Sequence, residues 1–191
     1  MTKGLIVVIS GPSGVGKGSV AAGLKAQDPH ITECVTCTTR APRPGERDGR
    51  EYHFLTKEAF EIKKDEGYFL EYAFVHGNYY GTPRREAMAL AEEGRTVLLE
   101  IDVQGGLNVK KAHPEAFTIF IMPPDRDTLR QRLSGRGTET PEQIALRLQN
   151  AEAEMDRRHL YDARVVNDDL QECIRRVAGL IDGEKKRQNG I

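Results

Sequence analysis

The sequence has few cysteines, almost no net charge and no long hydrophobic run, and each shortage removes a class of protein. Its three cysteines, Cys34, Cys37 and Cys173, are too few for a disulfide framework. Cys34 and Cys37 have CxxC spacing, but no second pair completes a zinc site, so we expect both to be small packed side chains. A net charge of −1 provides no field that would attract nucleic acid or an anionic membrane, and we expect neither as a partner.

The hydrophobic runs are short. The apolar run at residues 5–9 ends at Ser10-Gly11-Pro12, too soon for the apolar part of a signal peptide. No run approaches the roughly 20 residues of a membrane span, so we expect a cytoplasmic protein. A chain of 191 residues suits a single domain with a sizeable core and small insertions.

Buried strands alternate with helices through most of the chain. Apolar, β-branched runs predict strands at residues 5–9, 96–102, 117–122 and 164–167. Helical patterns are predicted at residues 17–26, 82–93, 104–112, 125–134, 141–158 and 169–187. This alternation favours an α/β fold with a parallel core sheet.

Residues 35–81 interrupt the alternation. They are rich in Thr, Tyr and Phe and are divided by turn residues such as Pro44-Gly45. The run 69–75, followed by Gly77-Asn78-Tyr79-Tyr80, predicts a β-hairpin, and residues 57–66 predict a short helix. We expect an inserted lobe with a mixed, mostly antiparallel sheet.

A glycine-rich loop at residues 11–17 follows the first predicted strand and opens a predicted helix, as a phosphate-binding loop requires. Glycines let backbone N–H groups turn toward an anion, and the helix N-terminus adds partial positive charge. The Lys17 ammonium can reach the β- and γ-phosphates. The residues expected to bind a nucleoside triphosphate here are Gly11, Pro12, Ser13, Gly14, Val15, Gly16, Lys17, Gly18 and Ser19.

Position 18 departs from the usual loop, in which a serine or threonine follows the lysine and its hydroxyl meets Mg²⁺. Gly18 stands there instead, so no side chain at this position can bind the metal. We expect Mg²⁺, carried as ATP-Mg²⁺, to be held mainly by phosphates and water, with the hydroxyl of Ser19 as the alternative. The protein ligands of the metal stay unassigned.

The loop alone does not choose between a GTPase, an ATPase and a kinase. A second candidate anion site follows it, because Arg40 and Arg43 stand three residues apart around a proline. Both guanidinium groups could point into one concavity and bind a phosphate bidentately.

Six motifs, in order and without large gaps over about residues 4–185, together resemble guanylate kinase. They are Gly11-Pro12-Ser13-Gly14-Val15-Gly16-Lys17, Thr38-Thr39-Arg40-Ala41-Pro42-Arg43-Pro44-Gly45-Glu46, Gly77-Asn78-Tyr79-Tyr80-Gly81, Glu100-Ile101-Asp102-Val103-Gln104-Gly105, Gly135-Arg136-Gly137-Thr138-Glu139-Thr140 and Asn167-Asp168-Asp169-Leu170. The resemblance implies transfer of the γ-phosphoryl group from the co-substrate ATP to GMP, and to dGMP, in purine nucleotide metabolism. The resemblance does not decide between a monomer and a homo-oligomer, so a homo-oligomer stays possible.

The resemblance also implies a three-layer fold of the P-loop NTPase type. Residues 1–34, 83–124 and 156–191 would form the core, residues 35–82 the GMP-binding lobe and residues 125–155 a helical lid. Closure of this lid would exclude water and limit wasteful hydrolysis of ATP.

Site residues follow from the resemblance in the same way. The GMP phosphate would be held by Arg40, Arg43, Tyr52 and Tyr80. The guanine base or its surroundings would be met by Thr36, Glu71, Thr82 and Asp102, of which the two threonines replace serines common in the family. Asn167 would belong to the ATP site. The catalytic cations would be Lys17, Arg40, Arg43 and the lid arginines Arg132, Arg136 and Arg147.

Chemistry supports the assignment of Glu71. One carboxylate can accept hydrogen bonds from both the N1–H and the N2–H₂ groups of guanine, whereas adenine has an acceptor at N1 and no 2-amino group. The acceptor phosphate has a second pKa of about 6 and is largely dianionic at neutral pH, so no general base is expected.

Three alternatives differ in class. A kinase of the same build acting on a ribosyl phosphate would not need Glu71 with Asp102. A non-catalytic binding module of this fold would commonly lack the phosphate loop, which is intact here. A GTPase switch would carry an Asn-Lys-x-Asp type of guanine signature, which this sequence lacks.

Overall fold

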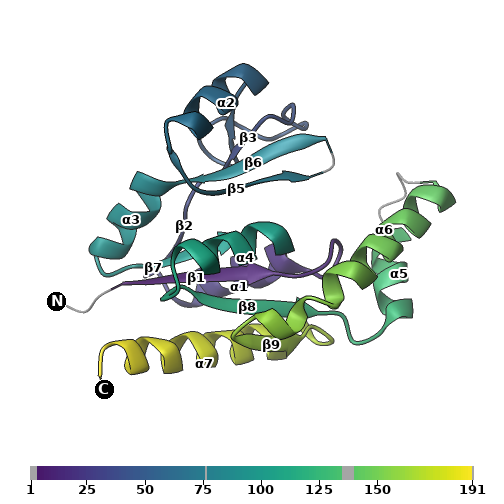
Figure 1. The fold of residues 1–191 in the computed structure, drawn as a ribbon. Helices are drawn as coiled ribbons and strands as arrows, with labels where there is room; N and C mark the ends of the chain where they lie inside the picture. The colour runs from purple at the N-terminus through teal and green to yellow at the C-terminus, as the bar shows by residue number, and fades with distance from the viewer. Residues whose placement is uncertain (1–3, 76, 135–139, 191) are drawn as a thin grey trace.

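The computed structural model describes residues 4–75, 77–134 and 140–190. Within these residues the strands form two sheets, a larger core sheet and a smaller one above it (Figure 1). None of the helices in the described part of the chain is long and apolar enough to cross a membrane.

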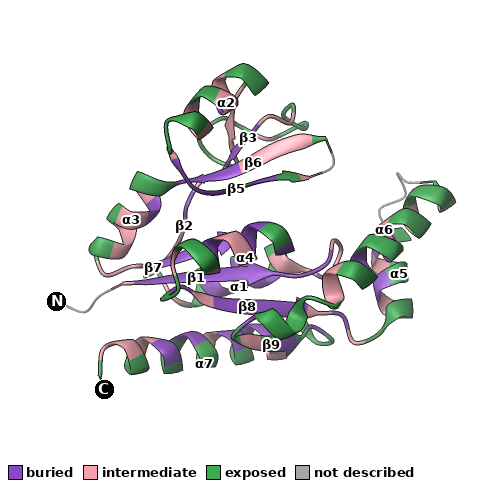
Figure 2. Cartoon of the chain, viewed as in Figure 1, coloured by how far each residue is buried: buried purple, intermediate pink, exposed green. Residues whose placement is uncertain are grey.

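The core sheet has five parallel strands in the order β2-β7-β1-β8-β9. The strands are β1 (Leu5–Ser10), β2 (Ile31–Glu33), β7 (Thr96–Glu100), β8 (Phe117–Met122) and β9 (Ala163–Val166). The central β1 is buried along its whole length, as expected for a parallel strand covered on both faces (Figure 2).

Alternate residues of β1 point to opposite faces of the sheet. Val7 packs in a cluster with the helices α1 (Lys17–Gln27) and α7 (Leu170–Gln188). Val8 packs on the other face, in a cluster with α3 (Arg84–Glu92) and α4 (Val103–Ala112). The result is the three-layer α/β/α arrangement expected from the alternation of strands and helices.

The smaller sheet has the order β4-β3-β6-β5, with β3 and β4 parallel and the other pairs antiparallel. Its strands are β3 (Cys37–Thr38), β4 (His53–Phe54), β5 (Phe69–Val75) and β6 (Asn78–Pro83). The helix α2 (Lys57–Asp65) begins at Thr56, whose hydroxyl caps it, and buries Phe60 against Phe69 with ring centroids 4.3 Å apart. The predicted hairpin and short helix of this lobe are therefore confirmed.

Two further helices lie at the edge of the core, beyond the carboxyl end of β8 (Figure 1). They are α5 (Arg126–Ser134) and α6 (Pro141–Met155), and they share an apolar cluster that includes Leu129, Leu133 and Leu148. A short 3₁₀ helix, η1 (Arg158–Leu160), leads from α6 to β9.

The boundaries of several predicted elements change. The helix predicted at residues 82–93 begins only at Arg84, because β6 extends to Pro83, and it ends at Glu92. The strand predicted at residues 96–102 ends at Glu100, because Asp102 caps α4 with its side chain. The helix predicted at residues 141–158 ends at Met155. The short edge strand β2 was not predicted, since three residues of which only Ile31 is fully buried carry no readable periodicity.

Candidate active site

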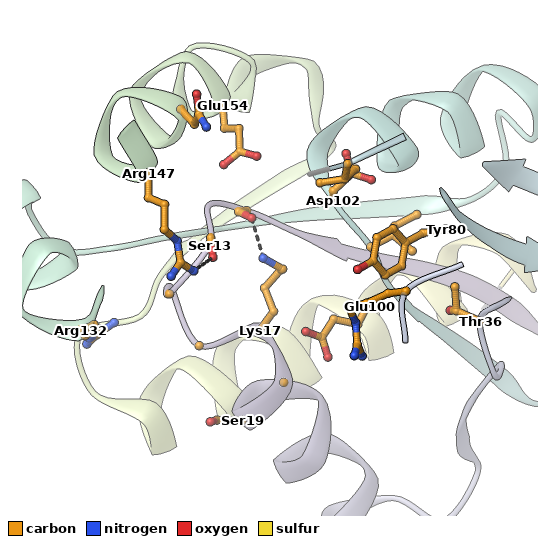
Figure 3. A pocket seen from close by; sticks show the side chains of 18 of the residues that line it. Ser13, Lys17, Ser19, Thr36, Tyr80, Glu100, Asp102, Arg132, Arg147 and Glu154 are labelled. Carbon is orange, nitrogen blue, oxygen red and sulfur yellow. Dashed lines mark hydrogen bonds between the residues drawn. The ribbon is translucent and has the colours of Figure 1, made fainter. Parts of the chain in front are cut away.

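A cleft of about 910 Å³ lies where the phosphate loop, the smaller sheet and α6 face one another (Figure 3). Its volume is in the range of small-molecule binding sites. The predicted site residues that line it are Gly11, Ser13, Gly14, Gly16, Lys17, Gly18, Ser19, Thr36, Arg40, Arg43, Tyr52, Glu71, Tyr80, Asp102, Arg132 and Arg147. Four others are buried and do not line it: Pro12, Val15, Thr82 and Asn167. Arg136 lies outside the described residues.

The phosphate loop is held by Asn167, at the carboxyl end of β9. The Asn167 side-chain amide donates to the carbonyl oxygen of Val15 over 2.8 Å. Gly16 has a φ of 96°, and a Cβ there would lie 2.6 Å from the Asn167 amide nitrogen, so only glycine fits. Asn167 therefore supports the conformation of the phosphate loop without lining the cleft.

The Lys17 ammonium bends back over the loop that precedes it. It donates to the carbonyl oxygens of Gly11 and Pro12, over 2.7 and 3.2 Å (Figure 3). These contacts hold the positive charge at the mouth of the loop, where a phosphate bound to the α1 N-terminus would meet it.

Glu100 is a cleft residue that sequence reasoning missed. It stands at the carboxyl end of β7, and burial raises the pKa of its carboxyl, an effect that the charge of Lys17 opposes. A Cβ at Gly18 would lie 3.5 Å from the nearer Glu100 oxygen. The signal available in the sequence was its place at the end of a buried parallel strand, where ligand sites of α/β folds gather.

Glu71 is buried between β5, β6 and α4 and keeps only 6% of its surface exposed. The Thr82 hydroxyl, opposite it in the hairpin, donates to one carboxylate oxygen over 2.8 Å. Burial raises the pKa of Glu71 to about 7; the hydrogen bond from Thr82 lowers it, and the negative charge of Asp102 raises it further. Thr82 thus orients Glu71 in this structure, a contact compatible with its predicted place at the guanine base or its surroundings.

Asp102 faces Glu71 from the N-terminus of α4. Its carboxylate accepts hydrogen bonds from the backbone N–H groups of Gln104, over 2.9 Å, and Gly105, over 3.3 Å. A Cβ at Gly105 would lie 2.8 Å from a Glu71 oxygen. A glycine at this position therefore lets two carboxylates lie close to one helix N-terminus, whose partial charge stabilises them.

Arg132 of α5 and Arg147 of α6 both contact the region of the phosphate loop. Arg132 donates to the backbone carbonyl of Asn167 over 3.0 Å. Arg147 donates to the Ser13 hydroxyl (Figure 3). Glu154, on the same helix, is a second cleft carboxylate that sequence reasoning missed, and burial raises its pKa. The helix α6 therefore contacts the phosphate loop at Ser13 through Arg147.

No preformed metal cluster is present in the described part of the chain: no three His, Cys, Asp or Glu side chains there are grouped to hold an ion. The CxxC pair is structural, as expected. Cys34 and Cys37 are buried, and burial raises their pKa values to about 12 and about 11, so both thiols stay protonated near neutral pH.

The fold and the cleft together define an α/β protein of the phosphate-binding-loop class. The sequence profile of the family described as guanylate kinase matches residues 3–184. The chain belongs to the guanylate kinase family, which confirms both the resemblance and the predicted fold class.

Individual relatives agree over nearly the whole chain. A guanylate kinase of Symbiobacterium thermophilum is 45% identical over 97% of this chain and 88% of its own length. One of Synechocystis sp. is also 45% identical, over 96% of each chain. The crystal structure of guanylate kinase from Anaplasma phagocytophilum is similar at a TM-score of 0.80, with 33% identity over 96% of this chain and 87% of that chain.

Proposed function

We propose that this protein transfers the γ-phosphoryl group of ATP to GMP, giving ADP and GDP, and that it also accepts dGMP. Membership of the guanylate kinase family supports this reaction. The observation that carries it is one cleft that joins a triphosphate loop, an arginine-bearing segment and the buried carboxylate Glu71. We place the reaction in the cytoplasm.

The base is recognised by Glu71 in this proposal. Its oxygens accept from the N1–H and N2–H₂ groups of guanine, and Thr82 fixes the carboxylate in place by its hydrogen bond. AMP would leave the desolvated carboxylate facing the N1 lone pair, and sites of this kind reject such analogues strongly. Thr36 and Asp102, which also line the cleft, complete the surroundings of the base.

The acceptor phosphate lies with Arg40, Arg43, Tyr52 and Tyr80, which all line the cleft on the side of the smaller sheet. The arginines neutralise its charge so that it can approach the γ-phosphate. Because this phosphate is largely dianionic near neutral pH, it attacks without a general base.

The donor is held by the loop N–H groups and Lys17 in this proposal, and Arg132 and Arg147, which line the same cleft, meet the transferring group. Mg²⁺, when bound with ATP, draws charge from the β- and γ-phosphates. The residues present fit this ion: the backbone at Gly18 lies beside the Glu100 carboxylate, an oxygen ligand of the kind Mg²⁺ prefers. We propose that Glu100, phosphates and water hold the metal.

We also propose a division of the chain into three parts. Residues 125–155 form the lid, residues 35–82 form the GMP-binding lobe, and the core consists of residues 1–34, 83–124 and 156–191.

A serine at position 18 is expected to lower the Mg²⁺ concentration needed for half-maximal activity by about 10-fold, since it restores a metal-binding hydroxyl. Its Cβ would sit in ordinary contact with Glu100, so Gly18→Ser is expected to fold. Magnesium titrations at fixed ATP measure the effect. Gly179→Ser, on the exposed side of α7 with open space around its Cβ, is the matched control. An unchanged magnesium requirement would show that the ion does not approach position 18.

Guanosine affinity is expected to fall as the pH drops below about 7. The pKa of Glu71 is raised from 4.5 to about 7, so the carboxylate gains a proton in this range and loses acceptor capacity for guanine. Affinity should then drop by about 10-fold per pH unit below 7 and level off above it. Guanosine is the ligand to titrate by calorimetry because it carries no phosphate of its own to ionise. Constant affinity between pH 8 and pH 5.5 would argue against Glu71 as the acceptor.

Product analysis tests the reaction itself. Incubation with ATP, Mg²⁺ and GMP is expected to give ADP and GDP in equal amounts on chromatography. ADP without GDP would mean that the protein is a hydrolase and that the proposal is wrong.

A further inference from the structure

Glu46, a residue with no role assigned so far, holds the guanidinium of Arg40. The Arg40 Nη2 atom donates to both Glu46 carboxylate oxygens, each over 2.9 Å. One of these oxygens also accepts from the backbone N–H of Arg43 over 2.8 Å. The Arg40 and Glu46 side chains keep only 15% and 17% of their surface exposed, so this ion pair is much less screened than a surface pair.

Arg40 is fixed from several other directions. Its guanidinium carbon lies 5.4 Å from the ring centroid of Tyr52, and its Nη1 atom donates to the Ala41 carbonyl over 2.6 Å. Tyr80 packs against Tyr52, with ring centroids 6.1 Å apart. Tyr52, Tyr80 and Arg40 all line the cleft, so the contacts hold the cation on the wall where we place the acceptor phosphate.

The segment that carries Glu46 would not fix Arg40 by itself. Residues 41–45 are exposed, and Gly45 has a φ of 90° with open space around it. Arg43, on this exposed stretch, is itself an exposed residue, and its backbone N–H donates to Glu46. The carboxylate of Glu46 therefore links the turn to the arginine that precedes the turn.

We propose that Glu46 is the positioning residue of the acceptor-phosphate subsite: it pre-orients Arg40 toward the phosphate and pins the turn that carries Arg43. This inference rests on the proposed function of the same cleft. Holding a long, rotamer-rich side chain in its bound geometry before the ligand arrives removes an entropic cost of binding. Glu46 touches neither the base nor the donor in this proposal, so its effect is confined to the phosphate of the acceptor.

The test compares Glu46→Ala, Glu46→Gln and the wild type by calorimetry with GMP and with guanosine. Glu46→Ala is expected to weaken GMP binding by about 10- to 100-fold, the range for loss of a charge-assisted hydrogen bond, and to leave guanosine binding unchanged. Glu46→Gln keeps one acceptor oxygen, so its affinity for GMP should lie between those of the wild type and Glu46→Ala. The KM for ATP should not move.

A double-variant cycle adds a readout that a merely structural role would not give. Because Glu46 acts mainly through Arg40, Glu46→Ala should weaken GMP binding much less in the Arg40→Ala background than in the wild type, and the loss that remains reports the pinning of the turn that carries Arg43. Glu51→Ala is the matched control. Glu51 accepts a backbone N–H from Arg47 over 2.7 Å in the following turn and does not line the cleft, so this variant should bind GMP normally.

Four results would overturn the inference. Unchanged GMP affinity of Glu46→Ala would show that the Glu46 carboxylate does not contribute to GMP binding. Tighter binding would show that it competes with the phosphate for Arg40. Equal losses for GMP and guanosine would show that the variant only disturbs the lobe. An equal loss of GMP affinity from Glu46→Ala in the wild type and in the Arg40→Ala background would show that Glu46 does not act through Arg40. A wild type that does not bind GMP would instead refute the proposed function.

Discussion

Replacing Glu71 with glutamine is expected to lower kcat/KM for GMP by a factor of about 10³ to 10⁴. The glutamine amide would present N–H donors to a guanine edge that also carries donors, so at least one buried hydrogen bond is lost and a repulsive contact replaces it. The donor site is formed by other elements of the chain, so ATP binding should be kept. Steady-state kinetics with GMP and calorimetry with ATP measure the two effects. Turnover of GMP at the wild-type rate would remove Glu71 from base recognition.

The same substitution is expected to stabilise the fold at alkaline pH. The folded-state pKa of Glu71 is raised from 4.5 to about 7, so ionisation of this carboxyl is less favourable in the fold than in the unfolded chain. Stability is therefore lost as the pH rises from about 4.5 to about 7, and glutamine avoids that loss. At about 1.4 kcal/mol per pKa unit, the gain in free energy of unfolding is about 3 kcal/mol at pH 8 and near zero at pH 4.

Urea unfolding of the wild type and Glu71→Gln at both pH values checks this gain. Glu66→Gln, an exposed glutamate of the same lobe, is the control and should change stability little at either pH. A gain of the same size at pH 4 and pH 8 would mean that repacking, and not the buried charge, accounts for it. Stability gained together with activity lost is the pattern expected where a site keeps a buried charge for function.

Replacing Lys17 with methionine is expected to lower kcat by about 10³-fold, because the loop loses the cation that neutralises charge on the transferring phosphoryl group. Its ammonium already lies at the loop mouth, bound to the carbonyl oxygens of Gly11 and Pro12. GMP binding should be retained, since the acceptor residues belong to another segment. Stopped-time assays of GDP formation and calorimetry with GMP give the two values.

Lys25→Met is the matched control for that experiment. Lys25 lies on the same helix α1 and pairs with Glu33, away from the cleft lining, so its loss should leave kcat within about two-fold of the wild type, as for a typical surface ion pair. Full activity of Lys17→Met, or equal losses in both variants, would contradict the assignment of the donor site.

The parts of the fold that the sequence predicted are those with a strong local signal. The run 5–9 could only be a buried strand, and the glycines after it required a tight turn into α1. The strand β2 escaped prediction because its three residues depend on pairing with β7 and not on their own periodicity. Likewise β7 was read two residues too long, because the capping of α4 by Asp102 competes with extension of the strand.

The candidate site divides in the same way. Glycines and arginines at motif spacing could be identified, since their chemistry is unusual wherever they stand. The acids Glu46, Glu100 and Glu154 were missed, because a sequence with 29 acidic residues does not show which of them the fold places at the cleft or against one of its arginines. The contact between Thr82 and Glu71 depends on the register of the β5–β6 hairpin, which fixes them as partners across the two strands.

The most direct test of the proposed reaction is ADP release measured with ATP-Mg²⁺ and each of GMP, AMP, CMP and UMP as acceptor. The buried Glu71 carboxylate and the arginine-lined wall predict rapid release with GMP alone, and rates with the other three lower by about 10³-fold or more. Comparable rates with AMP, or ADP release that needs no acceptor at all, would contradict it.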